Sequence, residues 1–170
     1  MKTFEELKEE LLNRAKNANA CQNGYRMGLD AQNKADLLKA ITANWFWVLR
    51  DAKIVDAIYL EENFTEEELS EAGIYTQKCH EVRTVSFACG SATVKAYGNA
   101  TVEAYDSATV KACGSATVEA CGNATVEAYG NSYVEDCTGN IRPKSDYAIV
   151  KDYYNHKIYI RKGKFEIIEV

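Results

Sequence analysis

The residues of this chain that could perform chemistry are few and scattered. Cys79-His80 is the one adjacent cysteine–histidine pair, and the second histidine of the chain is His156. A thiol–imidazole dyad needs its two side chains together in space, with a third group that orients the imidazole. Neighbouring residues of a strand point to opposite faces, which gives this pair poor geometry for a dyad. We therefore predict that the protein is not an enzyme.

Metal and cofactor sites are not predicted either. The acidic run from Glu61 to Glu71 lacks the alternating oxygen ligands and the fixed glycine of a calcium loop, and it is expected to be a solvated helix face. The sequence contains no C-x-x-C pair for zinc and no G-x-x-x-x-G-K-[ST] loop for phosphate. We predict no catalytic residue, no metal and no cofactor.

The cysteines are expected to be reduced. Four of the six recur at one position of a repeat, and the charged start of the chain lacks the apolar core of a secretory signal. No run approaches the roughly 18 to 20 apolar residues that a membrane span needs. We therefore expect a cytoplasmic protein with no membrane partner.

The net charge of −5 is spread unevenly. Residues 84–137 carry 2 basic and 6 acidic side chains, whereas residues 138–170 carry 7 basic and 4 acidic ones. Neutralising nucleic-acid phosphates requires clustered lysine and arginine. An acidic middle therefore argues against direct binding of nucleic acid.

The strongest pattern is an eight-residue repeat, which reads CGSATVKA, YGNATVEA, YDSATVKA, CGSATVEA, CGNATVEA and a decayed YGNSYVED. Each unit alternates apolar and polar residues, as a strand does, and ends in a two-residue turn such as Gly-Asn. Alanine, valine and alanine share one face, whereas threonine, a charged residue and tyrosine or cysteine share the other. This constant small apolar face predicts a β-solenoid, in which each coil is buried against its neighbours.

A meander of hairpins is the competing interpretation, but it would exchange the apolar and polar faces at every strand. Two coil lengths are compatible with the repeat. A flat coil of two repeats suits the small interior, although it stacks like charges at Glu103, Glu119 and Glu135. A coil of three repeats would instead stack Lys95 on Glu119 and Lys111 on Glu135, which is electrostatically favourable. We give packing more weight and expect 16 residues per coil rather than 24.

The first 83 residues are predicted to be helical. Thr3 with Glu6, and Thr65 with Glu68, match the capping box at the start of a helix. Apolar residues at helical spacing predict a first helix along Phe4, Leu7, Leu11, Ala15 and Ala18, and a second over 34–51. The segment 54–60 is of ambiguous type, and Gly73 is expected to end the helix that begins near Thr65.

Two further features of the head are predicted. Cys21-Gln22-Asn23-Gly24 is expected to be a turn with Gly24 at positive φ. Trp45 and Trp47 lie two residues apart on one predicted helix, so we expect one in the core and the other exposed as an interface anchor.

The tail is predicted to form strands over 146–154, 156–161 and 164–170, with turns at Asn155-His156 and Lys162-Gly163. The fold class is therefore α+β. We expect a helical N-terminal domain (1–83), an octapeptide-repeat β-solenoid (84–137) and a β-strand C-terminal cap (138–170). The head and the tail are expected to cap the two ends of the solenoid, because an open last coil exposes unpaired backbone.

Several features together resemble a group of uncharacterised proteins from bacterial phages and other mobile elements. They are Ala20-Cys21-x-x-Gly24, a helix with Trp45 and Trp47, the ATVxAYGN repeats and a tyrosine-rich strand tail. The likeness covers most of the chain. It implies a mobile-element setting, in which many small proteins bind and block host defence machinery.

We therefore predict a non-catalytic protein-binding module, specifically an inhibitor of a host nucleic-acid-binding defence protein, similar to anti-CRISPR proteins. Carboxylates spaced along the solenoid would imitate phosphates, and the tyrosine or cysteine of each repeat would face outward beside them. A structural or self-assembling solenoid that forms homo-oligomers is the alternative. The candidate binding surface consists of Tyr97, Glu103, Tyr105, Asp106, Glu119, Glu127, Tyr129, Glu135 and Trp47.

Overall fold

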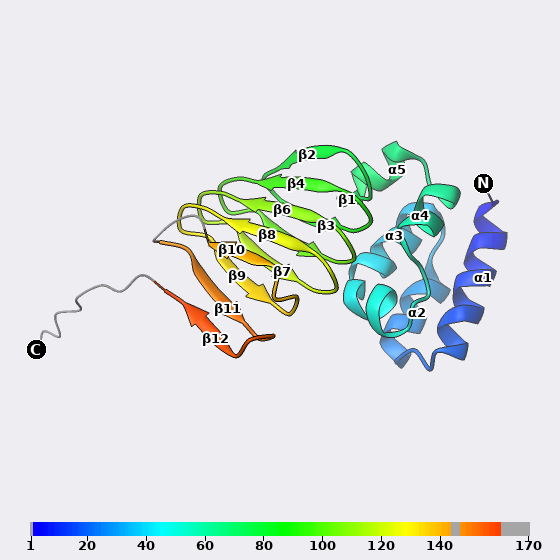
Figure 1. Ribbon diagram of the computed structural model, residues 1–170. Helices are drawn as coiled ribbons and strands as arrows, with labels where there is room; N and C mark the ends of the chain where they lie inside the picture. Colours follow the sequence, from blue (N-terminus) through cyan, green and yellow to red (C-terminus); the bar gives the residue numbers. More distant parts are fainter. Residues whose placement is uncertain (1, 144–146, 161–170) are drawn as a thin grey trace, which may run out of the picture.

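The computed structural model describes residues 2–143 and 147–160 of the chain. A helical head is followed by a parallel β-solenoid of about five turns over residues 74–152, as Figure 1 shows. The predicted α+β class and order of parts are therefore confirmed. The helices are α1 (Phe4–Asn17), α2 (Gln22–Asp30), α3 (Lys34–Thr42), the π-helix η1 (Trp47–Asp51), α4 (Ala57–Asn63) and α5 (Glu66–Glu71).

The predicted helix signals of the head largely hold. Both capping boxes form, so the Thr3 and Thr65 side chains accept the backbone N–H groups of Glu6 and Glu68. Gly73 follows α5 at φ 73°, in the left-handed region that favours glycine. Leu7 and Leu11 of α1 are buried, and the ambiguous segment 54–60 enters a helix, α4, at Ala57.

Two predictions for the head are wrong. The helix expected over 34–51 ends at Thr42, where the Asn44 side-chain amide donates to the Ala40 carbonyl at 2.9 Å and competes with the helical pattern. The turn expected at residues 21–24 is instead the start of α2, with Cys21 as its N-cap. Gly24 is helical, and a Cβ there would lie 3.2 Å from Asn44 Oδ1, so close packing explains the glycine.

The solenoid winds as two sheets, in which all strand pairs are parallel except that β12 pairs antiparallel with β11. One contains β1 (Ile74–Tyr75), β3 (Val85–Ala88), β5 (Thr101–Ala104), β7 (Thr117–Ala120), β9 (Tyr133–Asp136), β11 (Ile149–Asp152) and β12 (Lys157–Tyr159) in that order. The other contains β2 (Cys79–Val82), β4 (Thr93–Ala96), β6 (Thr109–Ala112), β8 (Thr125–Ala128) and β10 (Ile141–Pro143). We call them the seven-stranded and the five-stranded sheet.

Strand register decides between the alternatives for the repeat. Thr101 pairs in parallel with Thr117, and Thr109 with Thr125, so strands 16 residues apart are neighbours. This confirms the coil of two repeats and excludes both the 24-residue coil and the hairpin meander. The alanine, valine and alanine of each complete repeat are fully buried between the two sheets. Such small side chains fill the narrow layer without voids.

The solenoid is longer than its repeats, so the domain limits predicted at 83/84 and 137/138 fall inside it. Its N-terminal end carries Tyr75 and His80, whose positions align with the inner-facing Ala88 and Val94. Their rings stack with centroids 4.3 Å apart. These two residues therefore cover the start of the alanine–valine core.

At the other end, aspartates take the inner positions of alanine. Asp136 pairs with Ala120, and its carboxylate accepts the backbone N–H groups of Thr138 and Gly139 at 2.9 and 3.0 Å. Asp152 pairs with Asp136 and accepts the Asn155 backbone N–H at 2.8 Å. The regular alanine–valine repeat therefore ends at these two aspartates.

Of the predicted tail strands, 146–154 corresponds to β11 and 156–161 corresponds to β12. The predicted strand 164–170, with the turn at 162–163, lies outside the described residues.

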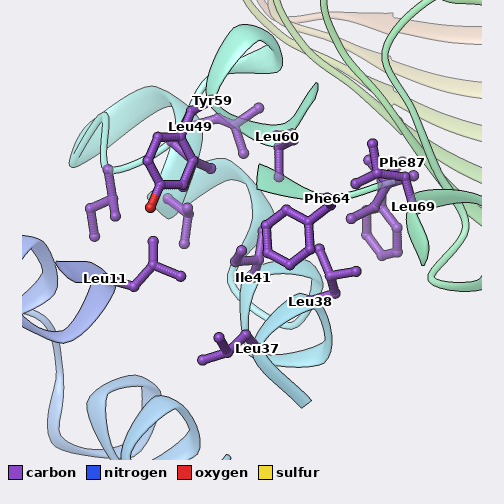
Figure 2. Packing of buried hydrophobic residues seen from close by; sticks show 14 of the residues in the cluster. Leu11, Leu37, Leu38, Ile41, Leu49, Tyr59, Leu60, Phe64, Leu69 and Phe87 are labelled. Carbon is purple, nitrogen blue, oxygen red and sulfur yellow. The ribbon is translucent and has the colours of Figure 1, made fainter. Parts of the chain in front are cut away.

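The head lies along one side of the solenoid, whereas we expected it to cap the end. Its hydrophobic core includes Ile74, Phe87 and Cys89 of the first coils, and Tyr105 of the next coil packs against it. Figure 2 shows Phe87 reaching the same cluster as Phe64 and Leu69 of the head. Arg50 Nη1 lies 3.5 Å from Cys121 Sγ, one coil further on. The head therefore spans four successive coils.

The glycines at the coil corners offer a stability test. Gly98 and Gly130 both have positive φ, at 64° and 60°, but a Cβ at Gly98 would meet nothing within 4 Å, whereas at Gly130 it would lie 2.9 Å from Gly114 O. We expect Gly98→Ala to lower the free energy of unfolding by about 1 kcal/mol, from backbone strain alone. Gly130→Ala should cost about 1–3 kcal/mol more, because the neighbouring coil must move.

Urea denaturation of the two variants measures this difference. Equal losses of stability would show that the coils are less tightly stacked at this corner than the structure indicates.

Candidate interaction surfaces

The predicted acidic array forms a column on the outer face of the seven-stranded sheet. Glu103, Glu119 and Glu135 succeed one another on β5, β7 and β9. Glu103 and Glu119 are only partly exposed, and desolvation, followed by repulsion from the next glutamate of the column, raises the pKa of each. Arg50 of the head partly offsets this rise in the pKa of Glu119. Glu119 therefore lies beside the head, and neither of these two carboxylates lies on an open surface.

The third member of the column has a different environment. Glu135 accepts the Tyr133 hydroxyl at 2.6 Å, the Lys151 ammonium at 3.4 Å and the Tyr153 hydroxyl at 3.5 Å. These contacts, led by the Tyr133 hydrogen bond, lower the pKa of Glu135. The negative charges of Glu103 and Glu119 are thus destabilised by their surroundings, whereas the charge of Glu135 is stabilised by its partners.

The remaining predicted solenoid residues are divided between other faces. Glu127 lies on β8 of the five-stranded sheet, where Lys111 Nζ is 3.5 Å away and the Tyr129 hydroxyl donates at 3.2 Å. Tyr97, on the same side, lies beneath the Arg83 guanidinium at 5.5 Å. Asp106 takes the place of the corner glycine in its repeat, at φ 60°. The predicted candidate residues therefore do not form one contiguous surface.

The outward tyrosine and cysteine positions separate into two columns, because successive repeats belong to different sheets. We call Cys89, Tyr105, Cys121 and Cys137 the head-side column, and Tyr97, Cys113 and Tyr129 the far column. The expectation that all of them face solvent holds for Cys137 but is wrong for the other three members of the head-side column. Cys89 and Cys121 are buried, and Tyr105 packs against the head core.

The head residues with predicted roles are mostly structural. Trp45 is buried, with its ring centroid 5.2 Å from that of Phe87. Trp47 is partly buried and packs against the same core, so it is not the exposed anchor that we expected. His80 stacks on Tyr75 while Cys79 lies exposed on the opposite face of β2, as the strand geometry predicted.

The acidic run of the head borders a cleft of about 880 Å³ between α4–α5 and β1–β2. Part of its charge is already compensated, because Lys78 contacts both Glu66 carboxylate oxygens at 2.7 Å and the Gln77 amide donates to Glu61 at 2.6 Å. Within residues 2–143 and 147–160, no group of three or more histidine, cysteine or acidic residues is arranged to hold a metal ion.

One group of exposed apolar side chains was not predicted. Most of the exposed large hydrophobic side chains of the described residues gather at the C-terminal end of the solenoid, on and around β11 and β12. Ile149 extends the outer column of Tyr133, and Ile158 pairs with Lys151, so both lie on the outer face of the seven-stranded sheet. We call this set the C-terminal apolar surface: Tyr147, Ile149, Tyr153, Tyr154, Ile158, Tyr159 and Ile160.

A signal for this surface was present in the sequence. The segment 147–160 is rich in tyrosine and isoleucine but does not repeat, and its strands were interpreted only as a cap. Strand periodicity alone could not show which of its faces remains exposed, because that depends on where the coil ends.

No protein-family model, curated protein or solved structure matches the chain. The resemblance to mobile-element proteins therefore stays a prediction. In the described part of the chain, none of the helices has both the length and the apolar character that crossing a membrane requires.

The acidic column provides a paired electrostatic test. We expect Glu103→Gln to raise the free energy of unfolding at neutral pH by a few tenths to about 1 kcal/mol, because it removes a like-charge neighbour. The raised pKa of Glu103 means that its charge destabilises the fold increasingly as the pH rises from the unfolded-state pKa through the folded-state pKa. The gain should therefore vanish toward acid pH.

Glu135→Gln is the matched control in the same column. Its lowered pKa predicts the opposite sign, a loss of stability at neutral pH that disappears as the pH falls through the folded-state pKa. Thermal denaturation of both variants from pH 2 to pH 8 measures the two effects. The same sign for both would contradict the assigned environments.

Proposed function

We propose that this protein is a non-catalytic protein-binding module of the cytoplasm that binds its partner with the C-terminal apolar surface. Contiguous exposed apolar patches on soluble proteins usually mark interaction sites. Tyrosine is favoured in such sites, because it contributes a large contact area at low entropic cost. The observation that carries the proposal is the exposure of the Ile158 side chain, at 65%, on the same outer face as Ile149, at the end of the solenoid that also carries four exposed tyrosines and Ile160.

The stacked coils of the solenoid form a rigid support for the C-terminal apolar surface. Each coil is held to the next by parallel backbone pairing and by the fully buried alanine–valine layer. The head contacts the first four coils through Ile74, Phe87, Cys89, Tyr105 and Cys121, and leaves β11 and β12 at the opposite end. A partner could therefore bind this end without displacing the head.

The narrower proposal places the protein in a phage or other mobile element, as an inhibitor of a host nucleic-acid-binding defence protein. The acidic repeat region supports this form through its excess of carboxylates over basic groups. Phosphate mimicry has weaker support, because Glu127 and Glu135 contact lysines and Glu103 and Glu119 are only partly exposed.

Two isoleucines with the same exposure allow a matched test of the binding surface. Ile158 of β12 is 65% exposed and Ile58 of α4 is 66% exposed. We expect Ile158→Lys to weaken partner binding by on the order of tenfold or more, since buried interface anchors carry most of the affinity. Ile58→Lys should leave binding unchanged.

The full chain with each substitution would be immobilised, and bound proteins from a bacterial lysate would be identified and titrated. Equal binding by the two variants would overturn the assignment of the surface. Charge reversal at Glu127 and Glu135 in the same assay tests phosphate mimicry, which predicts a loss of binding.

Self-assembly is the second candidate function, because β12 is the last strand of the seven-stranded sheet in the described residues. Two such strands can pair antiparallel about a two-fold axis, which places each Ile158 opposite its copy. Sedimentation at high concentration separates the two functions. Self-assembly predicts oligomers that Ile158→Lys converts to monomers, whereas a dedicated partner-binding module stays monomeric.

A further inference from the structure

Two cysteines succeed each other on neighbouring coils in the head-side column. Cys121 follows β7 and Cys137 follows β9, and the residues just before them, Ala120 and Asp136, are register partners. The Cys137 backbone N–H donates to the Ala120 carbonyl at 2.9 Å. Neighbouring strands lie about 4.8 Å apart, within the roughly 4.4–6.8 Å between Cα atoms that a disulfide spans.

The two side chains are also close enough to influence each other, since Cys137 contributes to raising the pKa of Cys121. No comparable pair exists among the other cysteines. Along their columns, Cys89 is followed by Tyr105, and Cys113 lies between Tyr97 and Tyr129. Cys121 and Cys137 are thus a defined dithiol, and both are free in the structure.

The environments of the two thiols differ in a way that orders their reactions. Cys137 is exposed, whereas Cys121 is 1% exposed and lies beneath the head, with Arg50 Nη1 3.5 Å from its sulfur. Burial raises the pKa of Cys121 to about 12, with a further contribution from Cys137 and an opposing one from Arg50. A reagent in solution therefore reaches Cys137 first, and Cys121 is reached through it.

We propose that Cys121 and Cys137 form a reactive dithiol site for low-molecular-weight disulfides such as glutathione disulfide. The Cys137 thiolate attacks one sulfur of glutathione disulfide, which forms a mixed disulfide at Cys137 and releases one glutathione thiolate. The Cys121 thiolate then attacks the Cys137 sulfur, which forms the Cys121–Cys137 disulfide and releases the second glutathione.

The reaction balances as a two-electron exchange. The protein loses two electrons and two protons, and one glutathione disulfide becomes two glutathione molecules. The Arg50 guanidinium is placed to stabilise the Cys121 thiolate, which forms in the second step. The Cys121–Cys137 disulfide covalently links the ends of β7 and β9, and therefore two neighbouring coils of the solenoid.

Peptide mapping tests the site on the full chain. Cleavage after glutamate places Cys113, Cys121 and Cys137 on three separate peptides, because Glu119, Glu127 and Glu135 lie between or beside them. After incubation with glutathione disulfide and blocking of free thiols, we expect a linked pair of the Cys121 and Cys137 peptides, lighter by two hydrogens than their sum.

Three variants separate this site from incidental oxidation. Cys121→Ser should stop at the mixed disulfide, with one glutathione retained on Cys137, and Cys137→Ser should leave Cys121 unmodified. Cys113→Ser should form the linked pair as the wild type does. Wild-type protein that retains glutathione on Cys137 without a cross-link, or that links other cysteines, would overturn the proposal. Circular dichroism confirms that each variant is folded before the comparison.

Discussion

The packing of alanine and valine between two closely spaced sheets is the interaction on which the rest of the structure depends. Each coil places one alanine–valine–alanine set from each sheet into the same thin layer, and these side chains are fully buried. Larger side chains would force the sheets apart, whereas smaller ones would leave voids that a close-packed interior does not tolerate. The thin layer fixes two strands per coil, and therefore which outer residues stack on which.

The two-strand coil also determines which outward-facing side chains stack on one another, and some of these stacks bring like charges together. A two-strand coil stacks Glu103 on Glu119 and Lys95 on Lys111, although a three-strand coil would have paired opposite charges. The interior decides, because a buried valine contributes about 1.5–3 kcal/mol whereas a cross-strand charge pair contributes only fractions of a kcal/mol. The head then covers part of the strained column, and Arg50 supplies a compensating charge beside Glu119.

Predictions from the sequence were most accurate where the pattern repeats. Strand, inner face and coil length followed from the alternation and from side-chain volume, and the two capping boxes followed from local hydrogen bonding. The errors lie where one side chain outweighs the pattern. Asn44 interrupts a helix whose apolar spacing continues, and Cys21 caps a helix although cysteine is not a usual N-cap residue.

The position of the head could not be obtained from periodicity, because it depends on which outer side chains the head core accepts. Phe87 occupies the position that glutamate takes in β5, and it joins the head core together with Ile74 and Cys89. The docked head buries Cys89 and Cys121 of the head-side column, which the repeat alone presents as exposed. The C-terminal apolar surface was missed for a related reason, since its exposure follows from where Asp136 and Asp152 end the regular coil.

The alternation of repeats between the two sheets also restricts how the chain can change in length. Insertion of a single octapeptide before Cys121 would move every later strand to the opposite sheet, so Cys121 would leave its place beneath Arg50, and β9 and β11 would extend the five-stranded sheet. Insertion of two would return each later strand to its own sheet, one coil further along. Duplication of repeats within this gene therefore keeps every later strand in its own sheet only when an even number of octapeptides is added. The sequence of one repeat alone does not reveal this condition.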